Sequence, residues 1–148
     1  MEIKDILKES NIFIIDKELT WKEAIYQASM PLVDQGFVEK RFPDEIIKNT
    51  LEFGPYYILV DDVAFLHVRP EQGVISNQIT IMVNKRDVVF DIKEKLKHAK
   101  LFITLAATGS DDHLMLMQKI AELLSDEDII QKIIETNSTD EIYELMIN

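Results

Sequence analysis

Three short apolar runs follow one another closely in the middle of the chain, with helical periodicity on both sides. They span 56–60, 63–68 and 78–83, and a fourth extended segment is predicted at 101–107. Short apolar runs bounded by turn residues are typical of strands. A parallel crossover needs a dozen or more residues, so strands this close along the chain cannot all run parallel. The pattern therefore predicts an α/β fold, a single layered domain with a mixed (parallel and antiparallel) β-sheet flanked by helices.

Local signals predict the flanking helices. The spacing of Thr20 with Glu23 and of Ser138 with Glu141 is that of a capping box, in which hydroxyl and carboxylate satisfy free backbone donors. Pro43 is typical of a first helical turn, and the following glycine-proline pair ends that helix at Phe53. A short helix is expected at 3–8, a strand at 12–15, and a helix or irregular segment at 91–97. A further helix is expected to run to Leu124, capped by Ser110, Asp111 or Asp112. The next helix is expected to begin at Asp126 or Asp128.

Composition excludes several classes of function. The 148 residues, 47% of them apolar, suffice for one domain over 1–148. The absence of cysteine excludes disulfides, thiolate zinc sites and cysteine nucleophiles. A net charge of −11 repels nucleic acid and anionic lipid. Because no apolar run approaches the roughly 20 residues that cross a bilayer, and because the first residues are polar, we expect a cytoplasmic protein without membrane insertion.

His67 ends the second apolar run and passes into Val68, Arg69, Pro70 and Glu71. This order places an imidazole and a guanidinium at the end of a strand, where a partner can reach them while the strand holds them in place. A neutral imidazole has one nitrogen with a free lone pair and can accept a phosphoryl group. On the residues alone, a packed structural histidine remains the alternative.

The other two histidines have different surroundings. His113 follows Asp111 and Asp112 at a predicted helix start, where backbone donors and the helix dipole favour phosphate. A polar surface histidine is the alternative there. His98 lies in a charged amphipathic stretch and is expected to be a solvated surface residue.

Two separated motifs resemble one family. The segment GPYYILVDDVAFLHVRPEQGV (54–74) resembles the active-site region of mannitol/fructose-type (type 2) EIIA domains of the sugar phosphotransferase system (PTS), and is most similar to the ascorbate-type branch. The segment AATGSDDHL (106–114), followed by KIAELL (119–124), is similar to the second histidine motif of the family. Both motifs occur in the order and at the spacing of the family, and the chain resembles this family over nearly its whole length.

The resemblance implies a phosphohistidine carrier, a phosphotransferase component. The small phosphocarrier HPr would phosphorylate His67, which would pass the group to an EIIB component that phosphorylates the sugar as the membrane EIIC component imports it. His113 would stabilise the phosphoryl group, with Arg69 and Ser110 in support. No metal or organic cofactor is implied. Alternation along the strand puts Phe65 on the same face as His67, so Phe65 and Val68 are predicted docking residues.

The sequence also departs from the family pattern. Asp61 and Asp62 replace a proline-glycine pair, Leu66 replaces the proline before the histidine, and no arginine stands at 51–52, where the mannitol-type branch has one upstream. Carboxylates facing the site would repel phosphate. Two other functions stay open: a regulatory EIIA-like domain of the nitrogen-PTS type, which signals by phosphorylation-dependent protein binding, and a small-ligand-binding α/β module.

Overall fold

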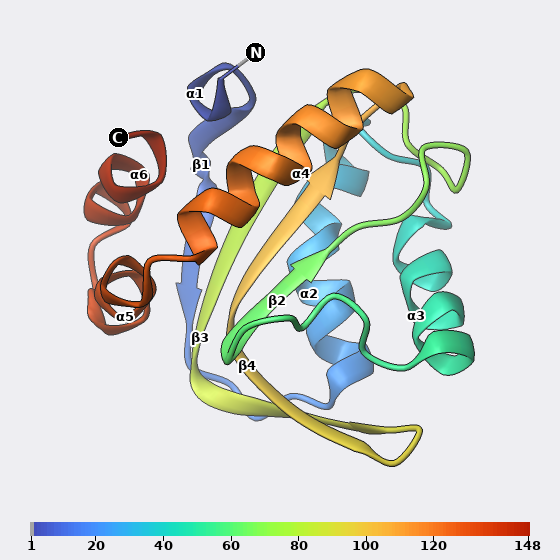
Figure 1. The fold of residues 1–148 in the computed structure, drawn as a ribbon, viewed down its shortest axis with the longest axis horizontal. Helices are drawn as coiled ribbons and strands as arrows, with labels where there is room; N and C mark the ends of the chain where they lie inside the picture. The colour runs from blue at the N-terminus through green and yellow to red at the C-terminus, as the bar shows by residue number, and fades with distance from the viewer. Residues whose placement is uncertain (1) are drawn as a thin grey trace.

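The computed structural model describes residues 2–148, except for the side chain of Ser110. Its centre is one four-stranded sheet, ordered β1-β3-β4-β2 (Figure 1). β1 pairs with β3 and β2 pairs with β4 in parallel, whereas β3 and β4 are antiparallel, so the predicted mixed sheet is confirmed. The strands are β1 (Leu7–Ile15), β2 (Asp62–Leu66), β3 (Gln78–Ile92) and β4 (Lys95–Ala106).

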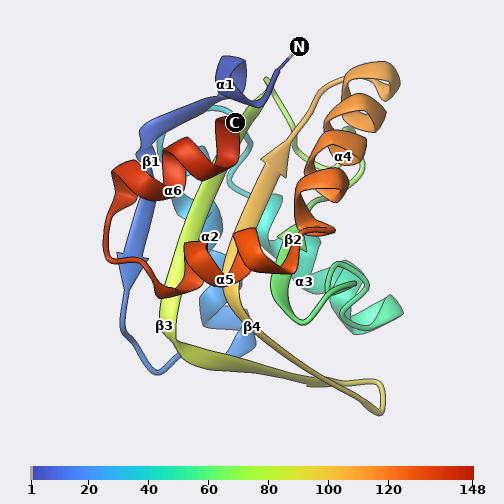
Figure 2. The same ribbon diagram turned by 60° about the vertical axis from the view of Figure 1, so that its left-hand side comes forward.

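Helices cover both faces of this sheet (Figures 1 and 2). On one face lie α2 (Trp21–Asp34) and α3 (Phe42–Phe53). The other face carries α4 (Ser110–Leu124), α5 (Glu127–Glu135) and α6 (Thr139–Ile147), with the short α1 (Ile3–Ile6) at its edge. Within residues 2–148, none of these helices has the length and apolar character needed to span a bilayer.

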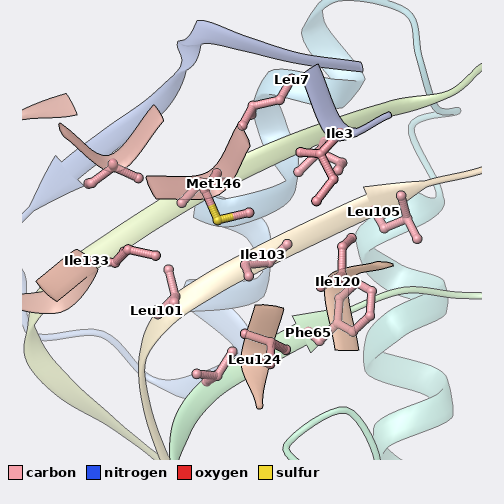
Figure 3. Close-up of a cluster of buried hydrophobic side chains, with 14 of the residues drawn as sticks. Ile3, Leu7, Phe65, Leu101, Ile103, Leu105, Ile120, Leu124, Ile133 and Met146 are labelled. Carbon is pink, nitrogen blue, oxygen red and sulfur yellow. The ribbon is translucent and has the colours of Figure 1, made fainter. Parts of the chain in front are cut away.

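Two apolar clusters fill the space between the layers. Side chains alternate along a strand, so Val63 and Phe65 of β2 pack towards α4–α6, whereas Ala64 and Leu66 pack towards α2 and α3. Figure 3 shows the first cluster, with Phe65 close to Ile120 of α4. The sheet is buried on both faces, which makes its strands a rigid support for groups at their ends.

The local helix signals are largely confirmed. The Thr20 hydroxyl accepts a hydrogen bond from the Glu23 backbone N–H at 3.2 Å, and the Glu23 carboxylate accepts one from the Thr20 N–H at 2.9 Å. Asp126 caps α5 and Ser138 caps α6. α3 ends at Phe53, before Gly54 with its positive φ of 80°. The predicted caps of α4 are wrong, because Gly109 occupies its N-cap position.

Three segments differ from the prediction. The helix expected at 3–8 ends at Ile6, and the strand expected at 12–15 begins at Leu7. Residues 56–60 form turns with one isolated bridge, between Val60 and Val63, because the chain reverses at once through Asp62, whose φ is +71°. The segment 91–97 is a β-hairpin in which Ile92 pairs with Lys95 across a two-residue turn with positive φ at both positions. Consequently β3 runs nine residues further than expected and β4 starts earlier.

Candidate active site

A pocket lies where β2 ends and α4 begins. Because β2 and β4 are parallel, their carboxyl ends share one edge of the sheet, and β4 leads directly into α4. This arrangement brings His67, one residue past β2, and His113, in the first turn of α4, to the same pocket, whose volume is about 480 Å³. Its lining residues are Asn49, Phe53, Tyr56, His67, Val68, Arg69, Gln72 and His113.

The His67 ring is held in one orientation. Its Nδ1 lies 2.8 Å from the backbone carbonyl oxygen of Phe65. A carbonyl only accepts hydrogen bonds, so Nδ1 donates and carries the proton of the neutral ring. The lone pair is then on Nε2. Two aromatic rings pack on the imidazole, Tyr56 edge-on at 5.5 Å and Phe65 tilted at 5.2 Å between centroids.

His113 lies beside this ring, with 6.1 Å between the two ring centroids. Its Nδ1 is buried and meets no hydrogen-bond partner among the described residues. Asn77, the residue before β3, holds the start of α4. Its side chain accepts from the Thr108 N–H at 2.7 Å and donates to the Asp112 carboxylate at 3.3 Å. The two histidines predicted as a functional pair are thus adjacent and supported by separate elements.

Burial favours the neutral form of both imidazoles. It lowers the pKa of His67 below the ordinary 6.5; the hydrogen bond to the Phe65 carbonyl partly opposes this, and the nearby His113 lowers the pKa further. Burial also lowers the pKa of His113, which the Glu71 carboxylate partly offsets. A protonated imidazole donates from both nitrogens, so the unpartnered Nδ1 of His113 is a further cost of charging it.

A nucleophilic His67 should therefore work at mildly acidic pH. Only the neutral ring has a lone pair, and the lowered pKa keeps the ring neutral as pH falls through 6.5. We expect the rate of phosphoryl uptake to fall as pH is lowered, with its midpoint below the ordinary imidazole value of about 6.5. NMR titration of the ring should report the same lowered pKa. A fall in rate centred above pH 6.5 would contradict this assignment of the neutral form.

Arg69 brings a positive charge to the pocket, whereas the carboxylates of Asp61 and Asp62 lie away from it. Arg69 lines the pocket and forms an exposed ion pair with Glu71, Nε to Oε1 at 3.2 Å. Exposed pairs of this kind are weak, so the guanidinium can exchange partners. Asp61 and Asp62 lie at the opposite end of β2, about 16 Å away at 3.3 Å per residue, and do not face His67.

The docking role predicted for Phe65 and Val68 is corrected. The two side chains are 6% and 3% exposed and belong to the two core clusters. The Phe65 ring does lie on the same side as His67 and packs on its imidazole, but α4 covers that side, so the ring is not open to a partner. Their structural task is packing, and Phe65 supports His67 both with its ring, which contacts the imidazole, and with its carbonyl, which accepts from Nδ1. The side chain of Ser110 lies outside the described residues, so its supporting role stays a prediction.

Sequence reasoning missed the residues that surround the histidine loop. Tyr56 donates from its hydroxyl to the His67 carbonyl oxygen at 2.7 Å. Asn49 and Gln72 form the buried wall of the pocket, and Phe53 lines it with 57% of its surface exposed. The available signal was the four-residue spacing of 41, 45, 49 and 53, which places these positions on one side of α3.

Comparison with known proteins assigns the family. The model of the "Phosphoenolpyruvate-dependent sugar phosphotransferase system, EIIA 2" family matches residues 5–148. This chain belongs to that family. It is 30% identical over 146 residues to the mannitol-specific cryptic phosphotransferase enzyme IIA component of Escherichia coli K12, covering 99% of this chain and 98% of that one.

Further EIIA relatives agree. The ascorbate-specific PTS EIIA component of Salmonella choleraesuis is 27% identical over 148 residues, with 99% of this chain and 96% of the relative covered. A solved complex of the mannitol enzyme IIA and phosphorylated enzyme IIB of Escherichia coli contains a chain that superimposes with a TM-score of 0.78 at 28% identity, covering 95% and 98% of the two chains. The protein is thus a phosphotransferase component of the EIIA type, related to mannitol-type and ascorbate-type members.

Proposed function

We propose that this EIIA protein is a cytoplasmic, single-domain phosphoryl carrier that accepts phosphate from phospho-HPr on Nε2 of His67 and passes it to an EIIB component. That component would act with a membrane EIIC transporter in sugar uptake. The observation that carries the proposal is the hydrogen bond from Nδ1 of His67 to the Phe65 carbonyl, which leaves Nε2 as the nucleophile. The family match supplies the class of reaction.

The transfer is an in-line displacement. The lone pair on Nε2 attacks phosphorus while the bond between phosphorus and the donor breaks, and the donor leaves with that bonding pair. The phosphorylated ring keeps its proton on Nδ1, where the Phe65 carbonyl stabilises the charge that develops on the imidazole. A ring N–H of His113 and the guanidinium of Arg69 act as donors to the phosphoryl oxygens. Passing the group to EIIB reverses these steps.

Transport is favoured over the regulatory alternative. The relatives carry names that refer to mannitol and to ascorbate, and one superimposable relative is solved with a phosphorylated enzyme IIB. The acidic surface of this chain, with a net charge of −11, suits partners that present basic groups around their own phosphoryl site.

Phosphorylation can be tested directly. We expect the protein, incubated with enzyme I, HPr and phosphoenolpyruvate, to gain the mass of one phosphoryl group and to lose it again in acid, as phosphohistidine does. Omission of HPr is the control and should leave the mass unchanged. A protein that takes up no phosphate, or a phosphate that survives acid, would contradict the carrier function.

The docking surface should lie on the exposed apolar residues beside the pocket. Leu114 follows His113 and is 59% exposed, and Phe53 lies across the pocket. We expect Leu114→Asp to raise the half-saturating concentration of phospho-HPr about tenfold, the equivalent of about 1.4 kcal/mol of lost contact. Steady-state transfer assays measure this value.

Leu96→Asp is the matched control. Leu96 is 61% exposed on the β3–β4 hairpin, which in Figure 1 extends from the end of the sheet opposite α4's first turn. It should leave the half-saturating concentration unchanged. Equal effects of the two substitutions would show that the introduced charge, rather than a lost contact, weakens binding.

A further inference from the structure

A polar stripe on α3 faces the loop that follows His67. Arg41, at the N-cap of α3, and Glu45 and Asn49 within it are spaced by four residues and so lie one above another on the helix. Each of them forms a hydrogen bond with the segment 69–72. Such a stripe ordinarily faces solvent, yet Asn49 is only 7% exposed.

The carboxamide of Gln72 is the centre of these contacts. Its oxygen accepts from the Arg69 backbone N–H and from Asn49 Nδ2, both at 3.1 Å. Its nitrogen donates to Asn49 Oδ1 and to Glu45 Oε2, both also at 3.1 Å. A carboxamide has two acceptor and two donor positions, and all four are used here in a residue that is 6% exposed.

Further bonds hold the rest of the loop backbone. Arg41 Nη2 donates to the Glu71 carbonyl oxygen at 2.8 Å, and the Gln72 N–H donates to the Arg69 carbonyl at 2.8 Å, closing a turn. The Tyr56 hydroxyl donates to the His67 carbonyl oxygen. Burial raises the pKa of Tyr56, and a hydrogen bond with the Asn49 side chain partly offsets this rise. The loop is therefore fixed at His67, Arg69 and Glu71 by one connected network.

We propose that Gln72, together with Asn49, positions the loop 67–72 so that the His67 ring and the Arg69 guanidinium address the same phosphoryl group. The role is positional, because Gln72 holds the Arg69 backbone N–H and Asn49 holds the Gln72 carboxamide. It rests on the proposed carrier function of His67. Phosphoryl transfer depends on alignment, and a displacement of about 1 Å can cost about a hundredfold in rate.

The chemistry of the pair favours positioning over simple stabilisation. A buried amide pair contributes little net free energy relative to apolar side chains of the same shape, but it fixes one relative geometry through directional bonds. The loop gains a defined backbone path at the residue, Arg69, that carries the cation. An apolar contact at this position would hold the loop close without fixing its register.

The test uses Gln72→Met, which keeps the length of the side chain and removes all four hydrogen bonds. We expect the transfer rate constant at saturating phospho-HPr to fall about tenfold or more, with the half-saturating concentration changed less than about twofold. The amide of Arg69 should exchange faster with solvent, since it loses its acceptor. A residue that only stabilised the fold would leave the transfer rate constant of the folded protein unchanged, and the Arg69 exchange shows that the loop contact has been removed.

Asn84→Leu is the matched control. Asn84 is a fully buried amide that also fixes a loop, with Nδ2 donating to the Lys17 carbonyl at 2.9 Å and Oδ1 accepting from the Lys17 N–H at 3.0 Å. It lies on β3 beside the end of β1, away from the pocket. We expect it to lower the melting temperature without changing the transfer rate constant of the folded protein.

The outcomes separate this proposal from the carrier function. Failure of the unmodified protein to take up phosphate would overturn the carrier function and the positioning role with it. Normal uptake by the unmodified protein with an equal rate constant for Gln72→Met would overturn the positioning role alone. If Gln72→Met does not fold, Asn49→Leu takes the same measurements. There too, a wild-type rate constant and unchanged Arg69 exchange count against the proposal.

Discussion

The His67→Ala protein should take up no phosphate from phospho-HPr. Of the two described histidines that line the pocket, His67 is the one whose ring a backbone carbonyl orients through Nδ1, whereas the Nδ1 of His113 has no such partner. Intact mass measurement after incubation with enzyme I, HPr and phosphoenolpyruvate reports the result. The substitution removes a half-buried ring at the end of β2, so circular dichroism should accompany it to establish that the fold is kept.

A matched control is available within the chain. His98 is an exposed histidine whose Nδ1 lies 2.5 Å from the Asp87 carboxylate, far from the pocket on the β3–β4 hairpin. His98→Ala should be labelled like the unmodified protein. Labelling of the His67→Ala protein, or loss of labelling in the His98 variant, would reverse the assignment of the acceptor.

His113→Gln should still be labelled, about tenfold to hundredfold more slowly. Glutamine keeps a donor and a similar bulk but removes the imidazole. Loss of one charge-assisted hydrogen bond to the phosphoryl group is worth roughly 1.5–3 kcal/mol, which gives this range of rates if the bond is fully formed in the transition state. Rapid-quench measurement of single-turnover transfer yields the rate constant, and the decay of the phosphorylated form yields its lifetime.

The two histidine variants must fail differently for the division of roles to hold. A His113→Gln protein without any label would make His113 indispensable rather than supporting. One with an unchanged rate and lifetime would remove it from the mechanism. His98→Gln, which makes the same substitution on the surface, controls for the chemistry of the replacement.

Much of the fold follows from local chemistry. Pro43 and Gly54 define α3 to within a residue because both act through their own backbone angles. The hairpin at 91–97 escaped prediction because its tip, 93–97, is exposed and mostly charged. The arm that leads into it does alternate, with Val88, Phe90 and Ile92 buried, and this strand signal was missed. The two positive-φ residues of the hairpin, Lys93 and Glu94, are not those that typically mark such a turn.

The site could be predicted in part. The motif resemblance predicts His67 and His113, and their proximity requires only that β2 and β4 be parallel and that β4 run into α4. Phe65 does lie beside His67, as alternation predicts, and the error concerned its exposure, because α4 covers that face of β2.

The network around Gln72 could not be read from the chain. Arg41, Glu45 and Asn49 form a polar stripe that, in sequence, looks like any solvated helix face. Only the return of the loop after His67 covers it, and that return depends on the tertiary arrangement of α3 and β2. The spacing of four residues was present, but its partner segment lies 23 to 30 residues away along the chain.

The position of the phosphoryl group on the ring is the most direct test of the proposed carrier role of His67. Two-dimensional NMR of the ring nitrogens in the phosphorylated protein distinguishes the two nitrogens of each histidine. We expect phosphorus on Nε2 of His67 and a proton retained on its Nδ1, bound to the Phe65 carbonyl. Phosphorus on Nδ1 of His67, or on His113 or His98, would contradict the proposal that His67 carries the group on Nε2.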